Sequence, residues 1–283
     1  MTTRTYNQEL PRPYGKSIGL RLLSALESTG IDPFTSSLAV QESAALGLTQ
    51  RHTVSILHRL VAAQWLTRVK KGVYAINDPV TKAPRAHPFA IGTALVTPST
   101  VSHWSALQHW GLTDQIPVTV TLSSSRRTFP PAYDSQHTRS RPAWIVAGTR
   151  YEVIAITKAR FFGISQVWVN ERNQVPIFDR ERALLDAFHH FHVFGSLSVA
   201  LEILENHLAD IDLTRLVRYA RQLSVAAVVK RIGWALERLE ASPEVLAPLL
   251  TYRSKGDTPL DPGRPARGHH NPTWHVIENL RDG

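Results

Sequence analysis

The chain has 283 residues, of which 43% are hydrophobic and 19% charged, and it contains no cysteine. This composition is typical of a globular protein of about two domains, and the lack of cysteine excludes disulfides, thiolate metal sites and cysteine nucleophiles. No apolar run has membrane-spanning length and the first residues lack the apolar core of a signal peptide, so we expect a cytoplasmic protein that makes no use of a membrane.

The formal net charge of +9 is unevenly distributed along the chain. Residues 1–85 hold 11 basic and 5 acidic side chains, whereas residues 171–250 hold 9 basic and 11 acidic ones. This asymmetry is expected when one end of a chain meets a polyanion.

Three short helices are predicted near the N-terminus. Apolar residues at helical spacing predict the first over 17–29. A second lies within 36–47, where Gly47 is a suitable C-terminal stop, and Thr49 can cap a third that runs to about Ala63. Two helices joined by a brief turn that contains glycine form the helix-turn-helix arrangement.

The sequence of the third helix predicts a DNA-binding surface. Its apolar stripe consists of Val54, Leu57, Leu60 and Val61, and the opposite face is polar and basic. Arginine can bond guanine or phosphate, glutamine can bond adenine, and the major groove admits such a helix. The candidate DNA-binding residues on this helix and at its cap are Thr49, Gln50, Arg51, His52, Ser55 and Arg59.

A basic hairpin follows this helix. Two alternating segments, 65–69 and 73–76, flank a tip that holds Lys70, Lys71 and Gly72. Such a hairpin after a recognition helix is a wing, and Arg68, Lys70 and Lys71 are its candidate contacts to phosphate or the minor groove. The alternative is a packing or protein-binding module whose basic face is only solvated.

Prolines and polar residues at 79–88 predict a linker, and a mixed α/β lobe is expected after it. A helix is predicted at about 99–110 and a strand at 118–122. Further strands are expected in 144–148, 151–157, 165–170 and 174–178, and further helices from 180 and in 198–207, 214–223 and 225–239. Asp179 is a suitable N-cap, and the i,i+4 spacing of Arg182 and Asp186 predicts a surface ion pair.

Two phrases of this lobe resemble a known family. They are "PSTVSHWSALQHWGLTDQIPVTVTL", Pro98 to Leu122, and "QVPIFDRERALLDAFHHF", Gln174 to Phe191. Both are similar to the corresponding phrases of AbiEi-type proteins, which are antitoxins and transcriptional regulators of bacterial abortive-infection toxin-antitoxin systems. The resemblance spans most of residues 15–240 and rests on apolar, structural motifs.

The resemblance implies a specific function. Members of this family carry an N-terminal winged helix that binds inverted repeats upstream of their own operon and represses it. Their C-terminal lobe neutralises a nucleotidyltransferase toxin encoded next door, without a tight toxin complex in some systems. Some relatives are orphan regulators without a toxin.

No enzyme signature is present, since the chain lacks a Gly-rich phosphate loop, a G-x-S-x-G motif and an H-E-x-x-H motif. His189, His190 and His192 could offer two imidazoles to a metal, but no third ligand has a recognisable spacing, and packing at a helix end is the preferred interpretation. His103 and His109 are six residues apart and do not share a helix face. We therefore expect no catalysis, no metal and no cofactor.

Two segments carry weaker signals. The polar loop 123–141 could extend a nucleic-acid footprint, although a solvated connector is the preferred interpretation. Its basic and aromatic residues are Arg126, Arg127, Phe129, Tyr133, Arg139 and Arg141. From residue 251 onward we expect an extended tail that either docks through Trp274 or stays loose.

The predicted fold class is α+β, with a winged helix-turn-helix domain at 15–78, a linker at 79–88, an AbiEi-like α/β lobe with a helical C-terminal part at 89–250, and a tail at 251–283. The predicted function is a transcriptional repressor and antitoxin of a type IV, AbiE-like system. Its partners would be double-stranded operator DNA and a cognate nucleotidyltransferase toxin. An antitoxin that acts mainly by protein contact through its C-terminal lobe, or an orphan regulator, is the alternative, and the oligomeric state stays open.

Overall fold

The computed structural model describes residues 17–128 and 143–280 and divides the chain into two compact units. The first unit holds the described residues up to Leu95 together with 169–173, and the second holds the others. In this described part the fold is α+β with three separate sheets, which confirms the expected class. None of its helices has the length and apolarity needed to traverse a lipid bilayer.

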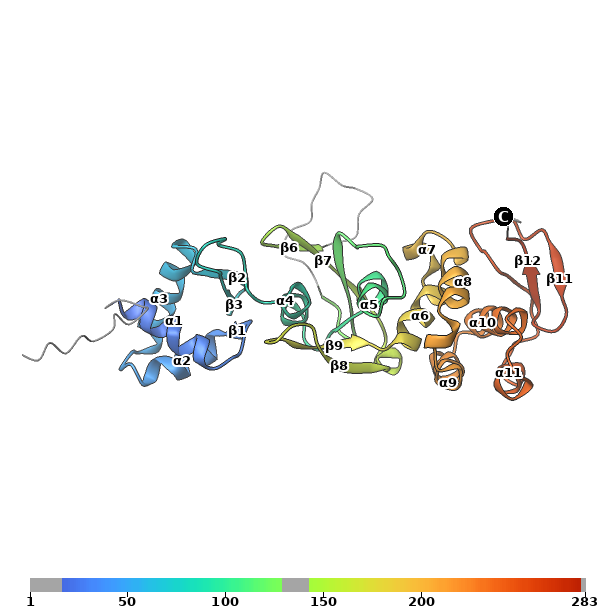
Figure 1. The fold of residues 1–283 in the computed structure, drawn as a ribbon, viewed down its shortest axis with the longest axis horizontal. Coiled ribbons are helices and arrows are strands. Elements are labelled where there is room, and N and C mark those ends of the chain that lie inside the picture. Colours follow the sequence, from blue (N-terminus) through green and yellow to red (C-terminus); the bar gives the residue numbers. More distant parts are fainter. Residues whose placement is uncertain (1–16, 129–142, 281–283) are drawn as a thin grey trace, which may run out of the picture. The chain divides into compact units, whose positions relative to one another are not determined.

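The first unit combines helices with a small antiparallel sheet (Figure 1). Its elements are α1 (Ile18–Ser28), β1 (Phe34–Thr35), α2 (Ser36–Ala44), α3 (Gln50–Ala62), β2 (Leu66–Lys70), β3 (Val73–Ile76) and α4 (Pro88–Leu95). The strand order is β1-β3-β2. At the β2–β3 tip, Gly72 has a φ of +75°, a conformation that glycine adopts without a Cβ clash.

Helices α1 and α3 share one apolar core with the sheet. The buried residues of this core include Leu22, Leu23, Leu26, Phe34, Ile56, Leu57, Leu60, Leu66, Tyr74 and Ile76. The inward face of α3 differs from the predicted stripe, because Thr53 and Ile56 are buried and Val54 is only half-buried. The buried face of α3 consists of residues at the i, i+3, i+4, i+7 spacing of one helix side, namely Thr53, Ile56, Leu57 and Leu60. Because Thr53 is polar, apolar periodicity alone does not identify it as buried.

The segment after β3 folds back onto the first unit instead of forming a simple linker. Asp78 accepts hydrogen bonds from the backbone N–H groups of Val80 and Thr81, which makes a compact turn. Arg85 then forms an ion pair with Glu27 of α1, with 2.6 Å between Nη1 and Oε1. The first unit therefore extends past residue 78, because the polar residues of this segment bond to one another and to α1.

Residues 169–173 also belong to the first unit. The Asn173 side chain donates to the Asp32 carbonyl over 2.5 Å and accepts from the backbone N–H of His87 over 2.9 Å. A segment distant in the sequence thus supports the turn that carries Asp32.

The second unit is organised around a six-stranded mixed sheet with the order β6-β7-β5-β4-β9-β8. The strands are β4 (Thr100–Val101), β5 (Thr119–Ser124), β6 (Ala143–Val146), β7 (Thr149–Ala155), β8 (Ile164–Trp168) and β9 (Gln174–Phe178). Thr100 and Val101 pair with β5 and β9, so helix α5 (His103–His109) begins later than the predicted 99. Thr100 and Val101 are strand residues because they pair with strands distant in the sequence, which helical periodicity does not reveal.

A series of helices follows the sheet. It comprises α6 (Arg180–His189), α7 (Phe191–Phe194), α8 (Leu197–Asn206), α9 (Leu213–Leu223), α10 (Ala226–Arg238) and α11 (Pro243–Leu250). Asp179 caps α6 by accepting from the Arg182 N–H, as predicted. Arg182 and Asp186 do form an ion pair, but the prediction of a surface pair is wrong: their side chains are 1% and 0% exposed, because α6 packs against helices on several sides.

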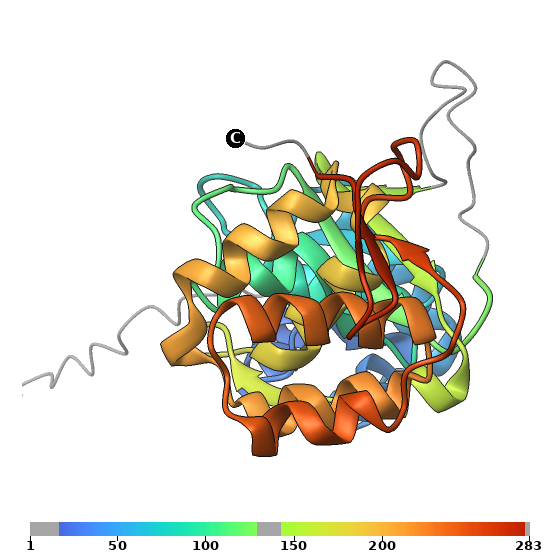
Figure 2. The ribbon, with the colours of Figure 1, turned by 90° about the vertical axis from the view of Figure 1, so that its right-hand side faces the viewer.

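The C-terminal residues form a third, three-stranded sheet in place of an extended tail. Its strands are β10 (Thr258–Pro259), β11 (His269–Asn271) and β12 (Val276–Glu278). Trp274 is fully buried against Gly233 of α10, and its indole N–H donates to Glu237 over 3.0 Å. Helices α10 and α11 lie side by side, with the C-terminal strands next to α10 (Figure 2).

Candidate nucleic-acid interface

Helix α3 is held at a defined depth and rotation in the first unit. The Thr49 hydroxyl caps it by accepting from the backbone N–H of His52, and the Thr53 hydroxyl lies 2.6 Å from the Ser43 hydroxyl of α2. Because Thr53 also lies beside the buried Ile56, the polar contact and the apolar core orient the same face inward. The exposed polar residues of the helix lie on its other side.

The outward face of α3 is polar and basic from its start to Arg59. Its exposed polar residues are Gln50, Arg51, His52, Ser55, His58 and Arg59. Arg51, Ser55, His58 and Arg59 are spaced i, i+4, i+7 and i+8, so they follow one side of the helix. His58 was not among the predicted contacts, although the same helical projection places it beside Arg59.

The β2–β3 hairpin carries two exposed cations, Arg68 and Lys71. Lys70 differs from them, because its ammonium donates to the Leu95 carbonyl over 2.9 Å within the same unit. Burial lowers the pKa of Lys70 from its ordinary value. A register shift between Arg68 and Lys70 interrupts the strict alternation of β2, which explains why two adjacent lysines have different surroundings.

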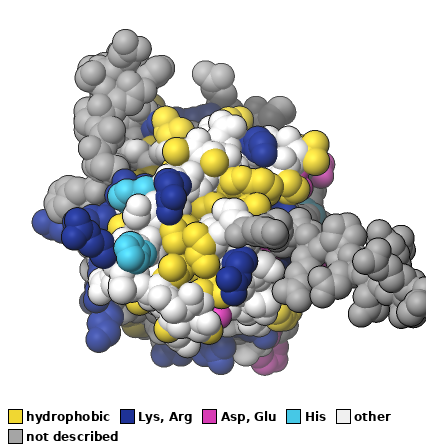
Figure 3. Space-filling model, turned by 90° about the vertical axis from the view of Figure 1, so that its left-hand side faces the viewer, with side chains coloured by type: hydrophobic (Ala, Val, Ile, Leu, Met, Phe, Trp, Pro, Cys, Tyr) yellow, Lys and Arg dark blue, Asp and Glu magenta, His cyan; other side chains and the backbone are white. Residues whose placement is uncertain are grey.

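The basic side chains of this surface are not neutralised by neighbouring carboxylates. Within the described residues, none of Arg51, Arg59, Arg68 and Lys71 forms an ion pair. A view of the first unit shows lysine, arginine and histidine side chains among apolar ones, with acidic side chains sparse (Figure 3). An unpaired set of cations on one face attracts a polyanion.

The polar loop after β5 is only partly described. Arg126 and Arg127 are exposed, whereas Phe129, Tyr133, Arg139 and Arg141 lie outside the described residues.

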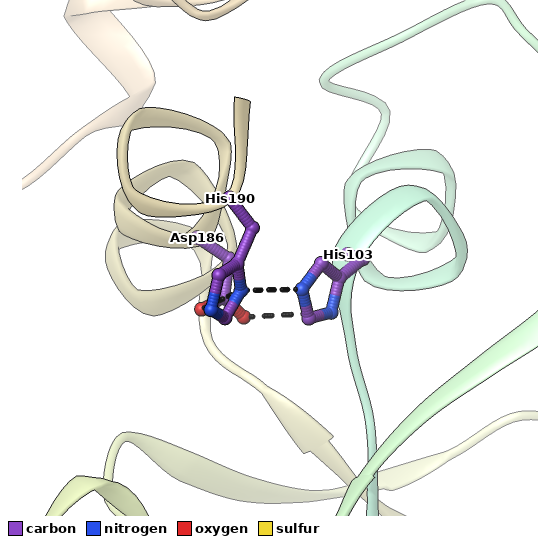
Figure 4. A group of neighbouring side chains, drawn as sticks. All are labelled: His103, Asp186 and His190. Carbon is purple, nitrogen blue, oxygen red and sulfur yellow. Dashed lines mark hydrogen bonds and ion pairs between the residues drawn. The ribbon is translucent and has the colours of Figure 1, made fainter. Parts of the chain in front are cut away.

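A second polar group lies inside the second unit. His103 at the start of α5 and His190 at the end of α6 face each other, with 2.9 Å between Nε2 and Nδ1, and Asp186 lies beside them (Figure 4). His103 also bonds the Ser102 hydroxyl over 2.9 Å, which accepts from Ser123 over 3.0 Å. No local pattern predicts this group, because its two imidazoles are 87 residues apart in the sequence.

Burial and one guanidinium set the electrostatics around Asp186 and His190. Burial lowers the pKa of His190 to about 4 and that of His189 to about 3. Although burial opposes ionisation of Asp186, the Arg182 guanidinium holds the pKa of this carboxyl below its usual range. Among the described residues, the buried Asp186 Oδ2 has no hydrogen-bond partner and lies 3.8 Å from His103 Nδ1. The group joins α5, α6 and β5.

His189, His190 and His192 do not converge on one point. Their rings contact one another in sequence, with 4.0 Å between the centroids of His189 and His190 and 6.0 Å between those of His190 and His192. The three rings therefore pack against one another in sequence at the end of α6.

Comparisons with known proteins inform the fold. No protein-family model and no curated protein matches the chain. The chain is similar in structure to the RV2827C protein from Mycobacterium tuberculosis, with a TM-score of 0.62 at 18% sequence identity, over 96% of this chain and 96% of that one. At this identity the likeness concerns the fold alone.

Proposed function

We propose that the first unit is a winged helix-turn-helix domain and that the protein is a transcriptional repressor that binds double-stranded DNA. One observation carries the proposal: α3 is anchored by its buried face and presents an unpaired basic face, Arg51 to Arg59, to the outside. The order α1-β1-α2-α3-β2-β3 also supports it, since a hairpin follows the helix that would enter the groove.

The spacing of the basic residues suits a major groove. Arg51 and Arg59 are eight residues apart, which is about 12 Å along a helix axis. This distance corresponds to roughly three to four base-pair steps of 3.4 Å. Arg51 and Ser55 would meet base edges, with His52 and Gln50 near the helix start, and Arg59 would reach a base or a phosphate.

The hairpin would bind the backbone of the same duplex. Arg68 and Lys71 are the exposed cations available for phosphate contacts, whereas Lys70 already donates to the Leu95 carbonyl. Repression would follow from occlusion of a promoter. Such a regulator would act in a bacterial cytoplasm.

We extend the proposal to an antitoxin of an AbiE-like system on the strength of the resemblance in 98–122 and 174–191. In this proposal the second unit counteracts a nucleotidyltransferase toxin, and the first unit represses the operon. Removal of residues 1–95 deletes the proposed DNA-binding surface and the contacts that residues 169–173 make with it. If this shortened chain still neutralised the toxin, neutralisation would be independent of DNA binding. A downstream gene for such a toxin is the simplest supporting observation.

Fluorescence anisotropy with a labelled duplex from upstream of the gene tests the DNA proposal. Arg51→Ala plus Arg59→Ala should weaken binding at least tenfold, since each good base contact contributes about 1–3 kcal/mol. Arg267→Ala, which removes an exposed arginine from the second unit, is the matched control and should bind like the native chain. Affinity that stays constant as salt rises would contradict a phosphate-binding surface.

A further inference from the structure

Two groups of side chains in the described residues place imidazoles and a carboxylate close enough to hold a metal ion. One is the buried group of His103, Asp186 and His190. The other lies on the surface of the C-terminal sheet and consists of Asp257, His270 and His275. In each group the ligand atoms lie within 4.8 Å of one another.

The surface group has the geometry of a transition-metal site. Asp257 Oδ1 is 2.9 Å from His270 Nε2 and 3.7 Å from His275 Nδ1, so both imidazoles approach the same oxygen. Ligand atoms bound tetrahedrally to zinc at 2.0–2.1 Å are about 3.4 Å apart. The two observed distances lie on either side of this value, and small rotations of exposed side chains suffice to equalise them.

Three segments of the fold position these ligands. His270 is the middle residue of β11, and His275 precedes β12 on the turn that Trp274 anchors in the core. Asp257 precedes β10, and the buried Lys230 ammonium holds the residues on both sides of it, through the Gly256 carbonyl and the Thr258 hydroxyl. The ligands therefore stand on a backbone that is already fixed, which reduces the entropy lost on binding.

The charge balance favours the surface group over the buried one. Asp186 is already paired with the Arg182 guanidinium, so a divalent ion there would add charge to a buried site that contains an arginine. Both imidazoles of that group are also joined in a hydrogen bond to each other. Asp257, by contrast, forms no ion pair with an arginine or lysine in the described part of the chain, and the Lys230 ammonium acts on it only at longer range. Solvent reaches all three ligands.

We propose that Asp257, His270 and His275 bind a divalent transition-metal ion, with zinc as the reference ion and water at the remaining coordination positions. Imidazole and carboxylate are ligands that zinc accepts, whereas magnesium prefers oxygen donors alone. The ion would tie the segment before β10 to the β11–β12 hairpin. This inference does not depend on DNA binding by the first unit.

Isothermal titration of the untagged full-length chain with zinc chloride tests the proposal. One zinc ion per chain is expected, with no binding of magnesium. His270→Ala and His275→Ala should each weaken zinc binding more than about tenfold. Asp257→Asn keeps the shape but removes the charge, and it should weaken binding as well.

His269→Ala is the matched control, because His269 is an exposed neighbour on the same strand and points to the opposite face. It should bind zinc like the native chain. Zinc should also raise the melting temperature of the native chain and of His269→Ala, but not that of His270→Ala.

Three results would overturn the assignment. One is zinc binding no tighter than about 1 mM in the native chain. Another is an equal loss in His269→Ala and His270→Ala, which would indicate adventitious binding to surface histidines. The third is loss of zinc in His190→Ala with retention in His270→Ala, which would place the ion at the buried group.

Discussion

The hydroxyl oxygens of Ser43 and Thr53 lie 2.6 Å apart and join α2 to α3 inside the first unit. Both side chains are fully buried. A buried hydroxyl that loses its partner is costly, whereas removal of both partners is cheaper. The pair therefore holds the rotation of α3, on which the direction of Arg51 and Ser55 depends.

The two single replacements should each lower the free energy of unfolding, and the sum of their effects should exceed the effect of the double replacement. We expect Thr53→Val to lower the free energy of unfolding by about 1–3 kcal/mol, because Ser43 keeps only its bond to the Val40 carbonyl. Urea denaturation of Ser43→Ala, Thr53→Val and the double variant gives the coupling energy. Additive effects within about 0.3 kcal/mol would mean that the two hydroxyls do not interact.

Lys70 and Lys71 should respond differently to truncation although they are adjacent. Lys71→Ala should weaken DNA binding and reduce the slope of log affinity against log salt by about 0.9, the value for one phosphate contact. Lys70→Ala should leave that slope unchanged and reduce stability, because the Leu95 carbonyl loses its donor. Anisotropy titrations at several salt concentrations separate the two effects. If both variants lowered the slope equally, the Lys70 ammonium would have to exchange its bond to the Leu95 carbonyl for a phosphate contact when DNA binds.

Gly233→Ala should strongly destabilise the second unit. A Cβ at this position would collide with the Trp274 ring, and the buried indole cannot move away without losing its bond to Glu237. Overpacking of a core typically costs about 1–3 kcal/mol. Gly256→Ala is the control, since a Cβ there meets nothing within 4 Å. Urea denaturation should show a lower midpoint for Gly233→Ala alone.

The two units should respond to pH in opposite directions. In the second unit, burial lowers the pKa values of His189 and His190 to about 3 and 4. As the pH falls, these two imidazoles therefore become protonated in the unfolded chain at a higher pH than in the folded one. Their contribution to stability is complete above pH 6.5 and declines as the pH falls from 6.5 toward 4. In the first unit, burial raises the pKa of Asp32 to about 6. Its contribution is complete below pH 3.8 and is lost as the pH rises through 6.

Each of these groups changes the free energy of unfolding by about 1.4 kcal/mol per pH unit within its window. Trp65 is the single tryptophan of the first unit, and the other six lie in the second. The fluorescence of Trp65→Phe therefore reports the second unit, and the difference between the native chain and Trp65→Phe reports the first. Asp32→Asn should abolish the pH dependence seen by Trp65. A parallel decline of both units on acidification would contradict the assignment for Asp32.

The sequence by itself determined the elements whose signal is local. Helical spacing located α1, α2 and α3, the Lys-Lys-Gly tip located the hairpin, and the Asp179 cap located the start of α6, because caps, turns and amphipathic faces depend on residues within a few positions of one another. The basic face of α3 followed from the same periodicity.

Only the tertiary structure decided which of these groups are buried and which meet. It brought His103 to His190, buried the Arg182–Asp186 pair, turned Lys70 toward Leu95 and packed Trp274 on Gly233. These outcomes depend on contacts between segments far apart in the chain, and helical or alternating periodicity carries no information about which distant surface a side chain will face.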